Sequence, residues 1–129
     1  RGAYLAESVV HCGECHTPRN LLGAARRDMA YAGTRTGPED SIVPNITPDR
    51  KTGIGRWRER EIAEYLDSGM TPGGDSAGDL MAEVIDRSTS RLTQADREAI
   101  ATYLLSLPPI ENVVRKEKKK PKGKDEFGF

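Results

Sequence analysis

The chain has 129 residues and a formal net charge of zero, a length that suits one domain. Hydrophobic residues make up 36% of it, and its aromatic residues are only two Phe, one Trp and four Tyr, a small supply for a core of this length. The charge is uneven, because residues 115–126 contain seven Lys or Arg and three acidic residues and form a basic tail on a mildly acidic body. We expect no nucleic-acid partner. Since no run of about 18 apolar residues occurs, we also expect no transmembrane segment.

Residues 1–10 are predicted to form a helix in which Leu5 and Val9 share one apolar face. Gly2 and Ala3 are small enough to let another helix approach closely. The segment has no signal-peptide pattern, and it begins inside the predicted helix without Met, which leaves open a leader or an upstream domain before it. This helix leads directly into a pair of cysteines.

Residues 17–55 are rich in Gly, Pro, Asn, Asp and Thr and show no strong periodicity. A loop of this length is unusual inside a compact domain, and it needs something to wrap around. A large flat cofactor is a candidate, and it would also compensate for the few aromatic side chains.

Further helices are predicted over residues 58–68, where Gly69 would end the helix, and over residues 78–85. The last helix begins after Thr93 as N-cap, with Asp96 placed to complete a capping box, and it ends before a proline pair. Its apolar stripe consists of Ile100, Tyr103, Leu104 and Leu107. Because no alternating strand pattern occurs, the predicted fold class is all-α.

The decisive motif is CGECH at residues 12–16, a C-x-x-C-H pattern. Two thiols one helical turn apart can add to the two vinyl groups of one haem, and the adjacent imidazole of His16 then lies under the iron as an axial ligand. Cys12 and Cys15 are therefore candidates for covalent attachment of haem c. The alternatives are a thioredoxin-like redox pair, which would need a preceding strand, and half of a zinc site, which would need two more ligands. His11 is expected to be a surface or packing residue.

A second axial ligand would have to come from elsewhere in the chain, and three methionines are available. Met29 lies only 13 residues after His16, and Met70 follows the glycine that ends the second helix. Met81 lies ahead of the final helix, where a loop could return over the distal face of a haem. A methionine in a helix is more often a core residue than a ligand, so the spacing alone leaves the choice open.

The chain resembles class I cytochrome c, and more narrowly the monohaem cytochrome c domains and subunits that accompany bacterial periplasmic dehydrogenases. The resemblance covers residues 1–110, which we predict to be the haem domain, and leaves residues 111–129 as the basic tail. The matching stretches are RGAYLA (1–6), CGECHT (12–17), VPNITPD (43–49), TGIGRW (52–57), MAEVI (81–85) and residues 92–109.

The resemblance implies a fold in which the first and last helices cross near the edge of one covalent haem. It implies that Met81 supplies the distal sulfur. It also implies that the indole N–H of Trp57 bonds a haem propionate, whereas the plain alternative makes Trp57 a core residue. Asn45 and Thr47 are expected to help hold the propionate side.

In this fold a proline carbonyl orients the proximal imidazole, and both Pro38 and Pro44 are candidates for that role.

The function that the resemblance implies is one-electron transfer, not enzymatic catalysis, with a dehydrogenase or reductase as donor and an oxidase or another cytochrome as acceptor. Because thioether attachment takes place outside the cytoplasm, the resemblance implies a periplasmic location. One alternative is a haem domain or subunit of a larger redox enzyme complex. Another, if Met81 is not a ligand, is a haem protein that reacts with peroxide or binds a small gas.

Overall fold

A computed structural model describes residues 1–38 and 41–114, and in these residues the fold is all-α, as predicted. No strand is present in the described part of the chain, where β-type pairing is limited to three isolated bridges. No helix in these residues is long and apolar enough to cross a membrane. The basic segment 115–129 lies outside the described residues. The helical elements are α1 (Gly2–Tyr4), the π-helix η1 (Leu5–Val9), α2 (Cys12–His16), η2 (Arg27–Met29), α3 (Glu59–Ser68), α4 (Asp79–Arg87), η4 (Thr89–Arg91) and α5 (Gln94–Ser106).

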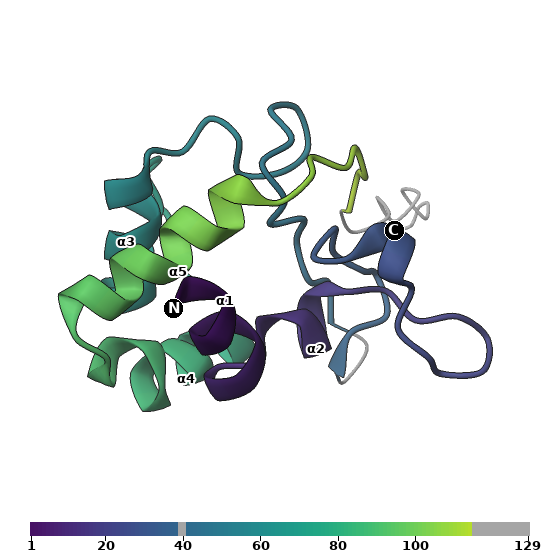
Figure 1. The fold of residues 1–129 in the computed structure, drawn as a ribbon, viewed down its shortest axis with the longest axis horizontal. Helices are drawn as coiled ribbons and strands as arrows, with labels where there is room; N and C mark the ends of the chain where they lie inside the picture. Colours follow the sequence, from purple (N-terminus) through teal and green to yellow (C-terminus); the bar gives the residue numbers. More distant parts are fainter. Residues whose placement is uncertain (39–40, 115–129) are drawn as a thin grey trace, which may run out of the picture.

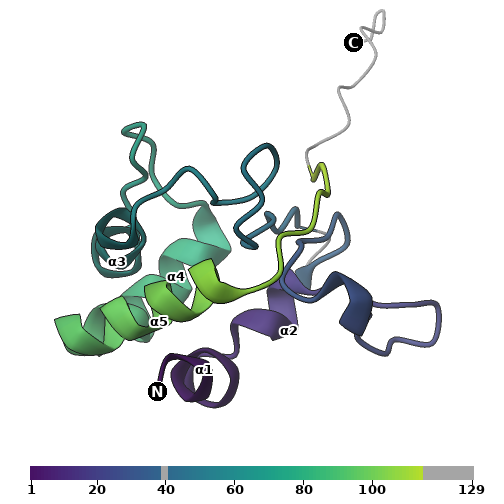
Figure 2. The same cartoon turned by 45° about the horizontal axis from the view of Figure 1, so that its top comes forward.

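The longer helices gather at one end of the molecule, and the irregular segments lie at the other (Figure 1). Helix α5 packs against both α3 and α1, and Figure 2 shows α5 crossing over α1. This crossing of the first and last helices agrees with the expected arrangement. The buried core is made of Leu5, Ala6, Tyr31, Ile54, Ile62, Leu66, Ile100, Ala101 and Leu104.

Gly2 allows the close approach of α1 to α5. A Cβ atom at this position would lie 2.0 Å from the carbonyl oxygen of Ala99, a distance that no side chain can occupy. The prediction of a small residue at a helix contact is therefore confirmed for Gly2. It is wrong for Ala3, which points to solvent.

The predicted helix over residues 1–10 is wound as α1 and then as the wider η1, and it ends at Val10. His11 has φ 58° and ψ 44°, in the left-handed region that non-glycine residues rarely adopt. The chain turns at this residue, so α2 begins as a separate helix. The C-x-x-C-H motif is therefore carried by a short helix of its own.

The caps of α3 and α5 follow the sequence closely. Gly69 ends α3 with φ 80°, and the Thr93 hydroxyl accepts a hydrogen bond of 3.1 Å from the Asp96 N–H. The predicted capping box is only half formed, because the Asp96 carboxylate instead accepts a 2.7 Å bond from Arg1 Nε. The first helix is thereby tied to the start of the last.

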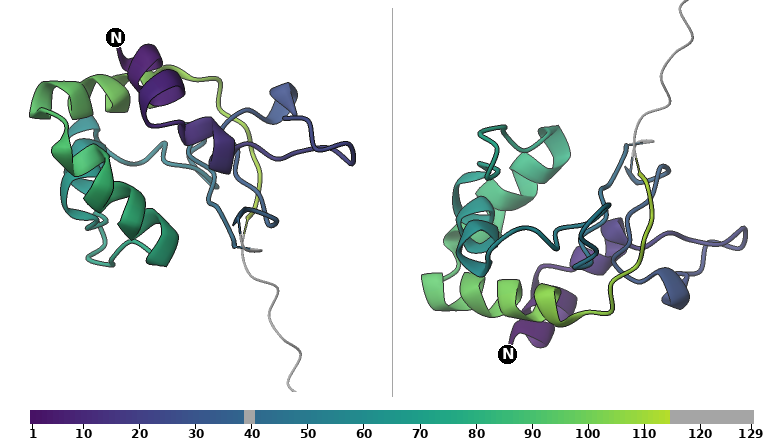
Figure 3. Two further views of the ribbon diagram at one scale, coloured as in Figure 1. Left: turned by 90° about the horizontal axis from the view of Figure 1, so that it is seen from below. Right: turned by 90° about the horizontal axis from the view of Figure 1, so that it is seen from above.

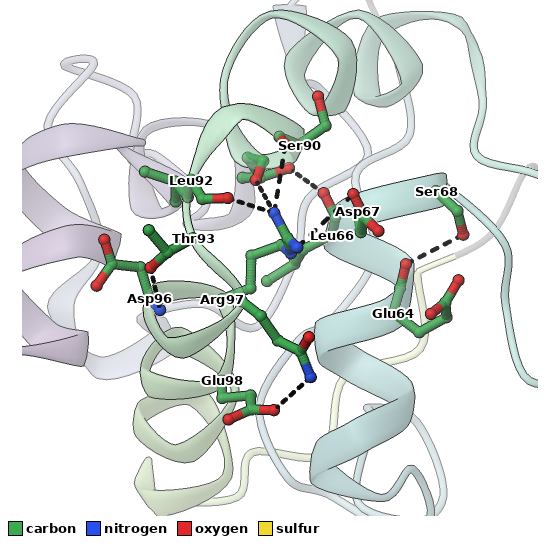
Figure 4. A network of polar contacts seen from close by, with 12 residues as sticks. Glu64, Leu66, Asp67, Ser68, Ser90, Leu92, Thr93, Asp96, Arg97 and Glu98 are labelled. Carbon is green, nitrogen blue, oxygen red and sulfur yellow. Dashed lines mark hydrogen bonds and ion pairs between the residues drawn. The ribbon is translucent and has the colours of Figure 1, made fainter.

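The corner between α4 and α5 is fixed by Arg97, whose side chain is only 11% exposed (Figure 4). Its guanidinium donates to the Leu92 carbonyl at 2.5 Å and to the carbonyls of Thr89 and Ser90 at 3.3 Å. The Thr89 hydroxyl in turn donates to the Leu66 carbonyl of α3. The Arg97 side chain of α5 thus bonds to η4 and to the residue that follows it, and it lies 3.8 Å from Asp67 of α3.

The irregular residues between α2 and α3 lie on the side opposite the helix cluster (Figure 3). The segment after α5 crosses them, and Asn112 donates from its side chain to the Ala32 carbonyl at 2.9 Å and from its N–H to Thr52 Oγ1 at 3.0 Å. These contacts extend two residues past the domain boundary expected at residue 110.

Candidate haem-binding site

The two cysteines lie on one turn of α2. Both are half-buried and neither forms a disulfide. Burial raises the pKa of the Cys12 thiol to about 11, so this group is neutral at pH 7. Two unpaired thiols one turn apart match the requirement for adding to the two vinyl groups of one haem.

His16 ends α2 with a buried ring. Its Nδ1 atom lies 2.7 Å from the Pro44 carbonyl oxygen, which can only accept a hydrogen bond, so Nδ1 carries the proton. The ring is neutral because burial lowers the pKa of His16. Its Nε2 atom therefore has a free lone pair held in a fixed direction, which is the form of histidine that binds a metal. Of the two prolines considered from sequence, it is Pro44 whose carbonyl reaches the ring.

The Pro44 carbonyl is held in place by the backbone around it. The Gly33 N–H donates to the His16 carbonyl at 2.6 Å, and Thr34 and Val43 exchange two hydrogen bonds of 2.8 Å. A Cβ atom on Gly33 would lie 2.7 Å from the Pro44 carbonyl carbon, and Gly33 has φ 88°. A glycine is therefore required where this loop meets the end of α2.

Tyr31 contacts the motif from the loop that follows it, and no sequence pattern indicates this role. It adopts φ 65°, its N–H donates to Thr17 Oγ1 at 3.0 Å, and its ring lies against Gly13. The ring also meets Tyr103 edge-on, with centroids 6.2 Å apart, and the Tyr103 hydroxyl donates to Glu7. The scarcity of aromatic residues is the only sequence feature that singles out Tyr31, because a loop residue with positive φ belongs to no periodic pattern.

Asn45 and Thr47 form a hydrogen-bonded clamp, and both are buried. The Asn45 amide donates to Thr52 Oγ1 at 3.0 Å and to the Ile110 carbonyl at 2.7 Å, while its oxygen accepts from the Thr47 N–H and hydroxyl. The Thr47 hydroxyl also accepts from the Ile110 N–H at 3.1 Å. The side chains expected on the propionate side thus join the loop to the segment after α5, and their polar atoms have protein partners.

Trp57 and Met81 both lie half-buried at the margin of the core cluster, as Cys12 does. The Trp57 ring stands edge-on to Tyr65, with centroids 5.6 Å apart. This position is compatible with both readings of Trp57, as a propionate donor and as a core residue. Met81 belongs to the first turn of α4.

The other two methionines differ in position from Met81. Met70 is 49% exposed and follows the end of α3, and Met29 lies at the end of η2 within the loop that follows the motif. Of the three, only Met81 packs against the core cluster that Cys12 also contacts.

The described residues give little support to the two alternative interpretations of the cysteine pair, a thioredoxin-like redox pair and half of a zinc site. No strand precedes Cys12, because η1 and His11 do. No group of three or more His, Cys, Asp or Glu side chains that could hold a metal ion occurs in the part of the chain that the structure describes. His11 is exposed and pairs with Glu14 at 3.1 Å, as expected of a surface residue.

The chain is similar to several bacterial cytochromes, although no protein-family model matches it. It is 50% identical over 111 residues to a diheme cytochrome c-type protein of Cereibacter sphaeroides, a match that covers 86% of this chain and 36% of that protein. It is 44% identical over 108 residues to the fructose dehydrogenase cytochrome subunit of Gluconobacter japonicus, covering 84% and 22%. It is 39% identical over 117 residues to the cytochrome c subunit of the quinone alcohol dehydrogenase of Gluconobacter oxydans, covering 85% and 24%.

Together with the site on α2, these similarities identify the chain as a c-type cytochrome, a class that carries covalently attached haem c. More narrowly, it is related to the cytochrome c subunits that accompany bacterial dehydrogenases. The chain spans about a third of the diheme protein and about a quarter or less of the two subunits.

Proposed function

We propose that this chain is a one-electron carrier that holds a single haem c through Cys12 and Cys15, with His16 and Met81 as the axial ligands of the iron. The observation that carries the proposal is the neutral, buried His16 ring, which uses Nδ1 on Pro44 and directs a free Nε2 away from it. The His16 ring lies on the same short helix as the two unpaired thiols, which precede it in the sequence. The single C-x-x-C-H motif supports a count of one haem in this chain.

The chain's own residues would set the properties of the bound group. A haem c supplies one-electron chemistry at its iron, and the protein supplies orientation, burial and ligand type. The Pro44 carbonyl makes the His16 ring a more basic and better oriented ligand. The Met81 thioether would favour the reduced state, and the adjacent apolar core would act in the same direction by excluding water. Trp57 would donate its indole N–H on the propionate side, and Asn45 and Thr47 would act there by holding the loop.

The short span of the match supports a second, compatible proposal, that this domain works as one haem module of a larger redox assembly. The donor would then be a dehydrogenase and the acceptor an oxidase or another cytochrome. The location would be the periplasm, because thioether attachment of haem takes place outside the cytoplasm.

Two measurements test the main proposal. The protein produced in a host that matures c-type cytochromes should give a pyridine haemochrome spectrum for one haem per chain, attached to residues 12–16. Colourless protein with both thiols free to alkylate would refute it.

The distal ligand is tested with a matched pair of variants. Met81→Ala should lower the reduction potential by on the order of 0.1 V, because axial ligands move haem potentials over a range of about 0.8 V, and should remove the sulfur-to-iron charge-transfer band. Met70→Ala should leave both unchanged. The reverse result would assign the ligand to Met70.

A further inference from the structure

The segment that follows Thr17 projects from the body as a hairpin (Figures 1 and 3). Its turn carries two solvent-exposed leucines, Leu21 and Leu22. Leu21 is 105% exposed and Leu22 is 93% exposed, the highest values among the exposed large hydrophobic residues in the described part of the chain. Adjacent exposed leucines bury nothing within the domain. They contribute little to the free energy of folding and leave adjacent apolar surface available for contact with a partner.

The hairpin is a built structure. The Asn20 side-chain oxygen accepts from the N–H groups of Leu22 at 2.9 Å and of Ala24 at 3.1 Å, and Gly23 makes the turn with φ 84°. At its base the Arg26 N–H donates to the Pro18 carbonyl at 2.8 Å. The two leucines are therefore presented on a turn whose backbone is already ordered, which lowers the entropic cost of binding.

The charge around the tip is opposite in sign to that of the body. Residues 19–28 contain three arginines, Arg19, Arg26 and Arg27, against the single acid Asp28, whereas residues 1–114 as a whole contain four more acidic than basic side chains. All four of these charged side chains are exposed. An apolar tip with a cationic rim is complementary to an apolar patch with an anionic rim.

We propose that this hairpin, residues 18–26, is the docking element for a redox partner protein whose contact surface is an apolar patch rimmed by carboxylates. The inference rests on the proposed function, because its location matters only if His16 binds a haem iron. The hairpin begins at Pro18, two residues after His16, so the docking element leaves the chain directly after α2. A partner that binds it is thereby held on the side of the molecule that carries the C-x-x-C-H motif, and two of the relatives are named as subunits of dehydrogenases.

A membrane surface is the competing occupant, and the hairpin suits it less well. Two leucine side chains bury less hydrocarbon than a single myristoyl chain, which by itself gives only marginal membrane binding. Arg19 donates to the Gly23 carbonyl within the hairpin, and Arg26 pairs with Asp28 at 3.0 Å. Both guanidinium groups thus have a partner within residues 19–28, which limits their orientations.

The experiment uses the haem-loaded protein and gold surfaces coated with methyl-terminated, carboxylate-terminated or mixed alkanethiols. The mixed layer stands for an apolar patch with an acidic rim, and the bound mass is read on a quartz crystal, so the readout does not depend on the haem. Wild type should bind the mixed layer more tightly than either pure layer. Leu21→Ser/Leu22→Ser should raise the half-saturation concentration at least about tenfold, which is about 1.4 kcal/mol. Val113→Ser, which changes a residue that is 43% exposed elsewhere, should bind like wild type.

Several outcomes would overturn the inference. They are equal binding of the double variant and wild type, an equal loss in the Val113 control, or tighter binding to phosphatidylglycerol vesicles than to the mixed layer. The haemochrome spectrum and the reduction potential of the same samples separate this failure from that of the proposed function. If the double variant keeps the wild-type spectrum and potential but loses binding, the docking inference is supported. If the spectrum shows no haem, the proposed function fails whatever the surfaces show.

Discussion

Asn45 is the residue whose removal should most directly connect stability with the candidate site. Its side chain makes four hydrogen bonds in a buried position, two donated to Thr52 and Ile110 and two accepted from Thr47. A typical internal hydrogen bond contributes about 1 kcal/mol net, and buried partners left unpaired cost about 1–3 kcal/mol. Since the Thr47 hydroxyl keeps its bond with the Ile110 N–H, we expect Asn45→Ala to lower the free energy of unfolding by about 3 kcal/mol. That corresponds to a fall in Tm of roughly 10 °C.

The assay is urea unfolding of the haem-loaded protein followed by far-UV circular dichroism. Asn20→Ala is the matched control, because Asn20 also accepts two hydrogen bonds but lies exposed on the hairpin, and its loss should stay below about 1 kcal/mol. Asn45→Asp should be at least as damaging as Asn45→Ala at neutral pH, because a carboxylate oxygen would face the Ile110 carbonyl at the present 2.7 Å. Equal losses for Asn20→Ala and Asn45→Ala would show that the clamp has no special energetic role.

Two further predictions concern the helix cluster. Arg97→Met should lower the free energy of unfolding by about 2 kcal/mol, because the Leu92 carbonyl loses a charged donor whose side chain is 11% exposed. Arg97→Lys should restore part of that loss. Urea midpoints that stay unchanged in Arg97→Met would contradict a stabilising role for the Arg97 hydrogen bonds. The hydrogen bond and charge of Arg1 hold the pKa of Asp96 below its usual range, so the native state binds fewer protons than the unfolded chain near that pKa. The Tm difference between wild type and Asp96→Asn should be constant from pH 7 down to about 4, the unfolded pKa, and shrink as pH falls through the lower native pKa. A difference that does not vary below pH 4 would show that Arg1 does not act through the charge of Asp96.

The helices were largely predictable from sequence, because their signals are local. Apolar spacing and caps placed α3 within one residue of the predicted 58–68, and Thr93 begins α5 as expected. The failures lie where a contact between distant residues overrides a local signal. Asp96 has the sequence position of a capping-box residue, but its carboxylate binds Arg1, 95 residues away in the chain. The predicted single helix over residues 1–10 is wound partly as a π-helix and ends at a left-handed His11, which no periodicity indicates.

The candidate site was easier to predict from the short motif than from the long loop. The motif at residues 12–16 pointed to Cys12, Cys15 and His16 as candidates, and the structure places these three residues together on α2. Tyr31, by contrast, acts through a positive φ and a hydrogen bond to Thr17, and the Asn112 contacts with Ala32 and Thr52 span the loop and the end of the chain. Irregular backbone has no repeat, so its partners can be found only from the three-dimensional arrangement.

The same loop contacts link the end of the described chain to the imidazole. Pro44 holds His16 Nδ1, and its neighbour Asn45 is held by the Ile110 carbonyl. The position of the Pro44 carbonyl, and with it the direction of the His16 lone pair, therefore depends on a segment that follows the last helix. A substitution at Ile110 is therefore expected to shift the His16 ring through Asn45 and the adjacent Pro44 carbonyl. Residues 110–112 are thus bonded to the loop that orients His16, and a domain boundary placed directly after α5 would remove these contacts.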